Sequence, residues 1–382
     1  MTNRPIYLDY NATTPHAPEV IEAMRPYIEE HFGNPSSSHW YGRKAREAVE
    51  KARSQVAALL NCAPGEIIFT SGGTESNNYA IRGIALARGS RGRHIITSQI
   101  EHPAVTAVCG RLERDGFEIT FLPVDRHGLV SVSDVQRAIR PETILITLMH
   151  ANNEVGTIQP IEEVAELANA RGIAFHTDAA QSAGKIAVDV RALGPDLLSL
   201  AGHKLYAPKG VGALYVRAGT LLERLMEGAG QEYGRRPGTE NVLEIVGLGK
   251  ACEIARRDLE VNAEHMRRLR DRLESALRQR VADIRVNGAP GRRLPNTLSV
   301  SFHGVDANIL LAAIEDKVAA SAGAACHSGQ VRVSHVLRAM QVPEEWARGT
   351  LRFSTGRMTS EADIDAAAAV VADAVERLRA GR

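Results

Sequence analysis

Residues 66–89 read EIIFTSGGTESNNYAIRGIALARG: a β-branched run, a Gly-Gly turn and then a helical stretch. The same alternation of short apolar runs and helical stretches continues to residue 217. The predicted strands are 66–70, 94–98, 118–124, 143–149, 173–177, 197–201 and 212–216. Most of them are continuously apolar, which is typical of strands that helices cover on both faces. The pattern predicts an α/β fold with a mostly parallel, seven-stranded sheet.

The C-terminal part of the chain differs in pattern. Residues 250–280 form a long, highly charged amphipathic stretch, which predicts a solvated helix that joins two domains. Strand-like runs at 284–288, 297–302 and 351–356, helices at 307–317 and at the end of the sequence, and a small-residue loop at 321–330 are expected after it.

We therefore expect two domains. The large domain covers residues 16–257, and a smaller C-terminal α/β domain covers residues 258–382. The N-terminal segment, residues 1–15, is expected to pack on the smaller domain.

Charge and composition exclude several classes of protein. The chain has 382 residues, with 46 Lys and Arg against 45 Asp and Glu, so its formal net charge is +1. This balance, with only 4% aromatic residues, argues against a dedicated nucleic-acid-binding protein. No apolar run is long enough for a membrane-spanning helix, and the N-terminal residues lack the apolar core of a secretory signal. We therefore expect a cytoplasmic protein.

The four cysteines, Cys62, Cys109, Cys252 and Cys326, are far apart in the sequence. A disulfide scaffold, a zinc ribbon or a CxxC redox motif is therefore not expected, and no metal site is predicted. Cys62, Cys109 and Cys252 are interpreted as small buried side chains. Cys326 lies among Gly, Ala and Ser, which argues against core packing and favours a reactive thiol on a mobile loop.

Polar clusters follow several of the predicted strands directly. They are SGGTESNN (71–78), Glu101 with His102, HANNE (150–154), Asp178 with Gln181, and GHK (202–204). Because the carboxyl ends of parallel strands meet at one edge of a sheet, these groups are expected to border one ligand crevice.

The chemistry of these clusters is more specific in combination than one by one. The Gly-Gly turn before a helix suits a phosphate, although an ordinary turn capped by Thr74 would explain it equally well. Asp178 alone suggests a structural ion pair, and Lys204 alone a solvated side chain. Together with His102, a planar ring that can stack, they match what pyridoxal phosphate needs: a phosphate cradle, a Schiff-base lysine and an acid partner for the ring nitrogen. Arg352 could clamp a substrate carboxylate, or form a plain surface ion pair.

The chain resembles the NifS-like cysteine desulfurases, which are fold-type-I pyridoxal phosphate enzymes. The motifs that carry the resemblance run nearly end to end. They are LDYNATTP (8–15), FGNPSSSHWYGRKA (32–45), FTSGGTESNN (69–78), IEHPAV (100–105), HANNEVGTIQP (150–160), HTDAAQSAGK (176–185), GHKLYAPKGVGALYVR (202–217), RRPGTEN (235–241), SHVLRAM (334–340) and LRFSTGR (351–357).

The resemblance implies a role for each matching residue at the ring. Lys204 would hold pyridoxal phosphate through a Schiff base, and Asp178 would pair with the pyridinium nitrogen. Gln181 would contact the phenolic oxygen. His102 would stack on the ring and assist proton transfers.

The resemblance also implies the phosphate and substrate contacts. Gly73, Thr74 and His203 would bind the phosphate, together with Thr239 of the partner subunit, which implies a homodimer. At the substrate end, the residues implied are Asn153, which also borders the cofactor, Arg352, and the catalytic thiol Cys326.

Two positions depart from the family pattern. Ala201 stands where the family often has a phosphate-binding Ser, and the cysteine loop reads GAACHS (323–328) where GSACTS is common. Both departures are similar to the selenocysteine lyase branch.

The resemblance implies a cysteine desulfurase that converts L-cysteine to L-alanine and leaves a persulfide on Cys326. The sulfur would pass to an acceptor protein, such as an iron–sulfur scaffold or a thiolation protein. The alternatives are a selenocysteine lyase, a non-catalytic protein with this fold and, less favoured, an aminotransferase.

Overall fold

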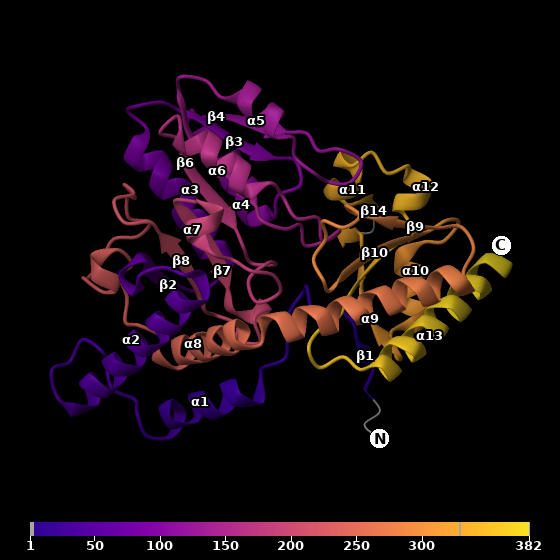
Figure 1. Ribbon diagram of the computed structural model, residues 1–382, viewed down its shortest axis with the longest axis horizontal. Coiled ribbons are helices and arrows are strands. Elements are labelled where there is room, and N and C mark those ends of the chain that lie inside the picture. Colours follow the sequence, from indigo (N-terminus) through magenta and orange to yellow (C-terminus); the bar gives the residue numbers. More distant parts are fainter. Residues whose placement is uncertain (1–3, 328–329, 382) are drawn as a thin grey trace.

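The structure is a computed structural model that describes residues 4–327 and 330–381; for 324–327 and 330–332 it describes the backbone alone. Two regions are visible in Figure 1, a helix-covered sheet built from the first two thirds of the chain and a smaller sheet formed by the last third. The N-terminal strand β1 (Ile6–Tyr7) lies beside the second region, where it pairs with β11 (Val318–Ala319) in parallel.

The large sheet has seven strands in the order β2-β8-β7-β6-β5-β3-β4. Their bounds are β2 (Ile67–Thr70), β3 (His94–Ser98), β4 (Glu118–Leu122), β5 (Thr143–Met149), β6 (Ala174–Asp178), β7 (Leu197–Ala201) and β8 (Gly212–Val216). Strands β3 to β7 pair in parallel, whereas β8 is antiparallel to both of its neighbours. The prediction of a mostly parallel seven-stranded sheet is confirmed.

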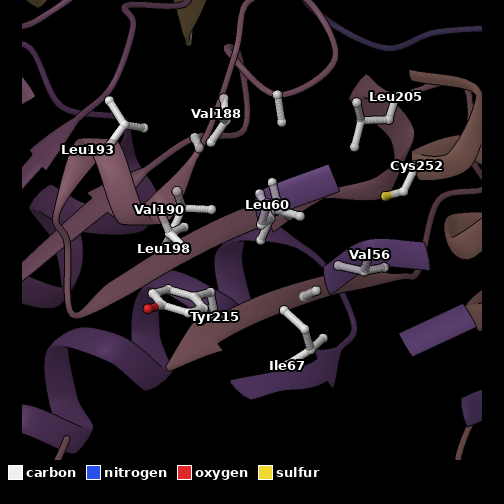
Figure 2. Close-up of a cluster of buried hydrophobic side chains, with 14 of the residues drawn as sticks. Val56, Leu60, Ile67, Val188, Val190, Leu193, Leu198, Leu205, Tyr215 and Cys252 are labelled. Carbon is white, nitrogen blue, oxygen red and sulfur yellow. The ribbon is translucent and has the colours of Figure 1, made fainter. Parts of the chain in front are cut away.

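Helices cover both faces of this sheet. One face carries α3 (Gly73–Arg88) and α4 (Pro103–Arg114). The other carries α2 (Trp40–Leu60), α5 (Val132–Ala138), α6 (Ile161–Asn169), α7 (Val190–Leu193) and α8 (Val242–Arg257). Figure 2 shows part of this second core, where Leu60 of α2 lies among side chains of the sheet and of the segment before α7. Burial on both faces explains why the strand runs are continuously apolar.

The second region is built on a four-stranded antiparallel sheet in the order β12-β15-β10-β9. These strands are β9 (Ile284–Asn287), β10 (Thr297–Phe302), β12 (Ser321–Ala322) and β15 (Thr350–Ser354). Helices α9 (Leu259–Arg280), α10 (Ala307–Ile314) and α13 (Glu361–Ala380) pack on it. Leu8 from the N-terminal segment belongs to the same buried cluster.

The remaining elements are short or lie at the edges. They are α1 (Pro18–Glu29), α11 (His335–Ala339), α12 (Glu344–Ala347) and the 3-10 turns η1 (Pro64–Glu66), η2 (Gly202–Lys204) and η3 (Glu232–Gly234). Among the helices of the described ranges, none has the length and apolar content needed to cross a lipid bilayer.

The prediction of a single solvated helix over 250–280 is wrong. The stretch contains the end of α8 and all of α9, which meet at Asp258, where the backbone leaves the helical region (φ −108°, ψ 13°). Nor is α9 only solvated: Met266, Leu269, Leu273 and Leu277 are buried at a spacing of three and four residues. Charged residues on the outer face concealed an apolar stripe that packs on the C-terminal sheet.

The loop predicted at 321–330 is also different in the structure. Strand β13 (Ala324–His327) pairs antiparallel with β14 (Gln330–Val333), and Cys326 lies opposite Val331. Small residues led to the prediction of a loop, but the backbone pairs as a hairpin. Of the other three cysteines, Cys109 and Cys252 are buried as expected, whereas Cys62 is only half-buried against the core. Burial raises the pKa of each of these thiols to about 12.

A buried ion pair anchors the segment that contains η3. Arg53 of α2 and Glu232 form two hydrogen bonds of 2.7 Å, and Glu232 also accepts from the backbone N–H of Phe69 in β2. The side chains are only 2% and 3% exposed. Glu232 and Tyr233 both have positive φ values, 48° and 57°, which are unfavourable for residues other than glycine. The ion pair therefore holds a strained turn against the core.

We expect Arg53→Ala to lower the free energy of unfolding by roughly 3 kcal/mol, because it leaves the Glu232 carboxylate buried without its charge partner. Urea denaturation followed by circular dichroism measures the change. The control is Arg25→Ala, whose exposed pair with Glu22 contributes less than about 1 kcal/mol. Equal effects of the two substitutions would contradict the anchoring role.

Candidate active site

The carboxyl ends of β5, β6 and β7 border one cavity of about 470 Å³, which we call the strand-end cavity. Pairing of Met149 with Asp178, and of Asp178 with Ser199, aligns these strand ends. The predicted site residues that line the cavity are Gly73, Thr74, His102, Asn153, Asp178, Gln181, His203, Lys204 and Arg352. The expectation that these polar clusters share one crevice is therefore confirmed.

The start of α3 forms one wall of the cavity. Gly72 has φ 147°, a conformation that favours glycine, and α3 begins at Gly73. A Cβ atom on Gly73 would lie 3.2 Å from the Cβ of Ala201, so the close approach of turn and strand leaves little room for a side chain. Thr74 is the second helical residue and not the cap, so its hydroxyl is not required for the turn. Free N–H groups at this end of a 16-residue helix suit a bound anion.

Asp178 ends β6 with its carboxylate held in place from two sides. Asn77 of α3 donates to Oδ2 at 2.6 Å, and the backbone N–H of Ala180 donates to Oδ1 at 2.9 Å. Asp178 is 7% exposed and lines the strand-end cavity, and these two donors are the hydrogen-bond partners of its carboxylate. Asn77 was not predicted as a site residue, although its spacing of three from Thr74 places both on one face of α3.

His102 serves two purposes in the structure. Its Nδ1 accepts from the backbone N–H of Ala104 at 3.1 Å and so caps α4, while the ring lines the strand-end cavity. A neutral ring with Nδ1 as acceptor has its proton on Nε2. Burial lowers the pKa of His102; Asp178 opposes this, and Lys204 adds to it. The ring is therefore neutral near pH 7, and its Nε2–H is free to donate into the cavity.

Lys204 follows β7 in the turn η2, and its amine contacts the N-terminal segment. Nζ donates to the carbonyl oxygens of Asn11 at 2.5 Å and Ala12 at 2.7 Å. Burial, together with the charge of Arg352, lowers the pKa of Lys204 to about 8, while Asp9 opposes the shift. About a tenth of this amine is therefore uncharged and nucleophilic at pH 7, far more than for an ordinary lysine.

His203 and Gln181 complete the polar lining near Lys204. Burial and the charge of Lys204 lower the pKa of His203 to about 4, so the ring is neutral. Its Nδ1 lies 3.2 Å from the hydroxyl of Thr13. Gln181 donates from Nε2 to the carbonyl oxygen of Asn11 at 2.9 Å.

Arg352, from β15, brings a guanidinium to the cavity from the C-terminal sheet. One Nη donates to Asp9 at 2.7 Å and to Ser321 at 3.0 Å, and the other donates to the carbonyl oxygen of Asn153 at 3.1 Å. Among the described residues, its Nε has no hydrogen-bond partner. The ion pair considered in the sequence analysis exists, but it lies at the cavity and not on the surface, because Arg352 is 9% exposed.

Two predicted site residues are not brought to the cavity by the described structure. Thr239 is exposed in the segment after η3 and does not line it. Cys326 lies in β13, and its side chain is outside the described part of the chain.

Asp9 and Asn11 were missed by the sequence analysis. Both belong to LDYNATTP (8–15), which was used for the resemblance but given no role. Their contacts join residues about 170 to 340 positions apart, and no local pattern reports such distances. The signal available was a cluster of polar residues beside an apolar N-terminal strand.

Comparison with known proteins identifies the family. The model of the family described as aminotransferase class-V matches residues 6–367. The chain belongs to the class-V aminotransferase family. Within it, a protein named cysteine desulfurase IscS from Dictyoglomus turgidum is 48% identical over 377 residues, covering 98% of this chain and 96% of that protein.

Solved structures place this class-V family member among NifS-like folds. A structure named NifS-like protein superposes with a TM-score of 0.91 at 37% identity, covering 98% of this chain and 99% of the other. A second, titled SspA in complex with cysteine, gives a TM-score of 0.82 at 40% identity, with 93% and 99% coverage. The fold-type-I assignment and the resemblance to NifS-like proteins are thereby confirmed.

The lowered pKa of Lys204 predicts how its reactivity depends on pH. In protein freed of any group bound to Lys204, modification by a small amine-directed reagent should rise about fivefold between pH 7 and pH 8, because the neutral fraction of an amine with a pKa of about 8 rises by that factor. Peptide mass spectrometry measures the rate at Lys204, with the exposed Lys44 as an internal reference for reagent strength. A rate at Lys204 that does not begin to level off above pH 8 would contradict the assignment.

Proposed function

We propose that this chain is a pyridoxal phosphate-dependent cysteine desulfurase that converts L-cysteine to L-alanine. The observation that carries the proposal is the meeting of Lys204, Asp178, His102 and the start of α3 at one cavity, in a chain that is 48% identical to a protein named cysteine desulfurase. The reaction removes the substrate sulfur and leaves it on Cys326 as a persulfide.

The residues at the strand-end cavity fit pyridoxal phosphate. The free N–H groups at Gly73 and Thr74 suit its phosphate, together with the neutral His203. Ala201 supplies no hydroxyl to that phosphate, so backbone N–H groups would take a larger share of the binding. Gln181 has a second side-chain N–H, which would donate to the phenolic oxygen. The cavity volume of about 470 Å³ leaves room for a small amino acid beside the cofactor.

The bound cofactor would supply an electron sink that stabilises negative charge at the substrate Cα. Lys204, whose amine is partly neutral, would hold the cofactor and later take the Cα proton on Nζ. Asp178 would keep a proton on the ring nitrogen. Its oxygens each have one protein donor and retain a lone pair for that purpose.

His102 and Arg352 would act on either side of the reacting atoms. His102 would stack on the ring and move protons through Nε2, since Nδ1 is occupied by the α4 cap. Arg352 would bind the substrate carboxylate together with Asn153, and its Nε is a donor without a partner among the described residues.

Cys326 would receive the sulfur. Its thiolate attacks the substrate sulfur, so an S–S bond forms as the Cβ–S bond breaks. The bonding electrons return to the carbon skeleton, which takes up a proton and leaves as alanine. The persulfide would then pass to an acceptor protein, such as an iron–sulfur scaffold, in the cytoplasm.

We expect Cys326→Ser to reduce sulfur release from L-cysteine by at least about a hundredfold while leaving the visible absorbance of the bound cofactor unchanged. Mass spectrometry should find one additional sulfur atom on Cys326 of the parent protein after a cysteine pulse. Cys62→Ser is the matched control, because Cys62 packs against the core and not at the cavity.

The same assay separates the alternatives. Fast turnover of selenocysteine with negligible turnover of cysteine would assign the chain as a selenocysteine lyase, which the departures at Ala201 and in the GAACHS loop favour. A protein that never acquires cofactor absorbance would be a non-catalytic relative. Normal desulfuration by Cys326→Ser would contradict the persulfide step.

We also propose that the protein is a homodimer. Each chain would divide at Asp258 into a large domain over 16–257 and a smaller one over 258–382, on which residues 1–15 pack. The exposed aromatic side chains support a partner surface, since Phe32, Trp40, Tyr41 and Tyr233 are 48–80% exposed. Thr239, which is exposed and away from the cavity of its own chain, would complete the phosphate site of the other subunit.

Mixing two inactive variants tests this arrangement. Lys204→Ala lacks the lysine, and Thr239→Ala weakens the phosphate site. A mixed dimer would contain one intact site, formed by Lys204 of one chain and Thr239 of the partner subunit. After subunit exchange, cofactor binding with parent affinity should recover at one of the two sites of each mixed dimer, measured by absorbance titration. No recovery in a mixture shown to contain mixed dimers would place Thr239 in its own chain's site or outside both.

A further inference from the structure

Lys185 is a buried lysine that the proposed reaction does not use. It is 5% exposed and does not line the strand-end cavity, but it is bonded to residues that do. Its Nζ donates to Oε1 of Gln181 at 2.9 Å and to Oδ1 of Asn11 at 3.1 Å. Two buried oxygens at the cavity wall therefore accept from this one amine.

These bonds determine the orientation of the Gln181 side-chain amide. Oε1 faces the donor Lys185, and Nε2 donates to the carbonyl oxygen of Asn11 at 2.9 Å. Rotating the amide by half a turn would place its NH₂ group against the amine and its oxygen against a carbonyl. The oxygen would then repel the carbonyl oxygen of Asn11, whereas the amine could at best accept from the NH₂ group, so only the observed orientation satisfies both ends of the amide. The second N–H of Gln181 is left for a ligand in the cavity.

Asn11 connects the Lys185 amine and the Gln181 amide to the C-terminal sheet. Its Oδ1 accepts from Asn296 at 2.9 Å, and its Nδ2 donates to the hydroxyl of Thr297 at 2.8 Å. Asn11 is 1% exposed. Lys185 thus joins the amide of Gln181 to a side chain that is fixed from the other region of the molecule.

A neutral amine suits this position better than a cation. Burial lowers the pKa of Lys185 well below its usual value, and the charges of Lys204 and Arg352 act in the same direction. A neutral amine still has two N–H groups, which match the two acceptors. It adds no further positive charge beside Lys204.

We propose that Lys185 is a positioning residue of this enzyme: it holds the Gln181 amide with its NH₂ group toward the cavity, and so fixes the donor to the phenolic oxygen of the cofactor. The inference rests on the proposed function, because that oxygen belongs to the proposed cofactor. Lys185 acts through Gln181 and touches neither cofactor nor substrate.

The test is the pKa of the cofactor bound to Lys204, read from its visible absorbance as a function of pH without substrate. In Lys185→Met, the Gln181 amide loses its hydrogen bond from the Lys185 amine and is no longer fixed. Its hydrogen bond to the phenolate oxygen of the cofactor therefore weakens. The proton shared between that oxygen and the nitrogen that joins the cofactor to Lys204 is then held more tightly. The pKa should rise by about one unit. Asn296→Ala is the matched control: it removes another donor to Oδ1 of Asn11 without touching Gln181, and should lower stability without moving this pKa.

A double-mutant cycle separates positioning from charge. If Lys185 acts through Gln181, Lys185→Met produces no further shift in a Gln181→Leu background. A shift of equal size in both backgrounds would mean that Lys185 acts through its own charge and would overturn the proposal. Lys185→Gln retains a side-chain N–H and should keep most of the parent value; if Lys185→Met does not fold, Lys185→Leu takes its place in the cycle.

Failure of the inference and failure of the proposed function give different results. A parent protein with no cofactor absorbance, even after addition of pyridoxal phosphate, would overturn the function. A parent protein with normal absorbance, whose pKa is unmoved by Lys185→Met despite a loss of thermal stability, would overturn only the positioning role and leave Lys185 as a structural residue.

Discussion

Parallel pairing of β5, β6 and β7 is the constraint on which the site depends. In a parallel sheet every strand ends at the same edge, so residues that follow different strands are brought within reach of one ligand. Asp178 and Lys204 are 26 positions apart in the sequence, yet both line the strand-end cavity. The apolar strand runs, which have no reactive side chains, thus determine where the reactive side chains lie.

The cavity is closed from outside the large sheet by the N-terminal segment and by β15. Asn11 accepts from Lys204 and Gln181 on one side and donates to Thr297 on the other, and Arg352 reaches Asn153 and Asp9. Polar contacts of this kind depend on geometry in a way that apolar packing does not. The relative placement of the two regions is therefore transmitted directly to the groups that line the cavity.

Much of this arrangement could be predicted from the sequence, because local patterns encode it. The seven apolar runs became the seven strands, and the polar clusters behind them became the cavity lining. The break at Asp258 and the hairpin around Cys326 were missed, since charge on an outer face and small side chains conceal tertiary packing and strand pairing. Asn11 and Lys185 were missed for a different reason: their importance arises from contacts with distant segments.

The pairing of Arg352 with Asp9 has a consequence for how a ligand enters. A carboxylate that reaches this guanidinium meets a charge that Asp9 already partly neutralises, while the Nε donor has no partner among the described residues. The pair with Asp9 spares the chain an isolated buried cation whenever no ligand carboxylate is bound. Because Asp9 lies two residues after β1, the same pair also ties the N-terminal segment to β15.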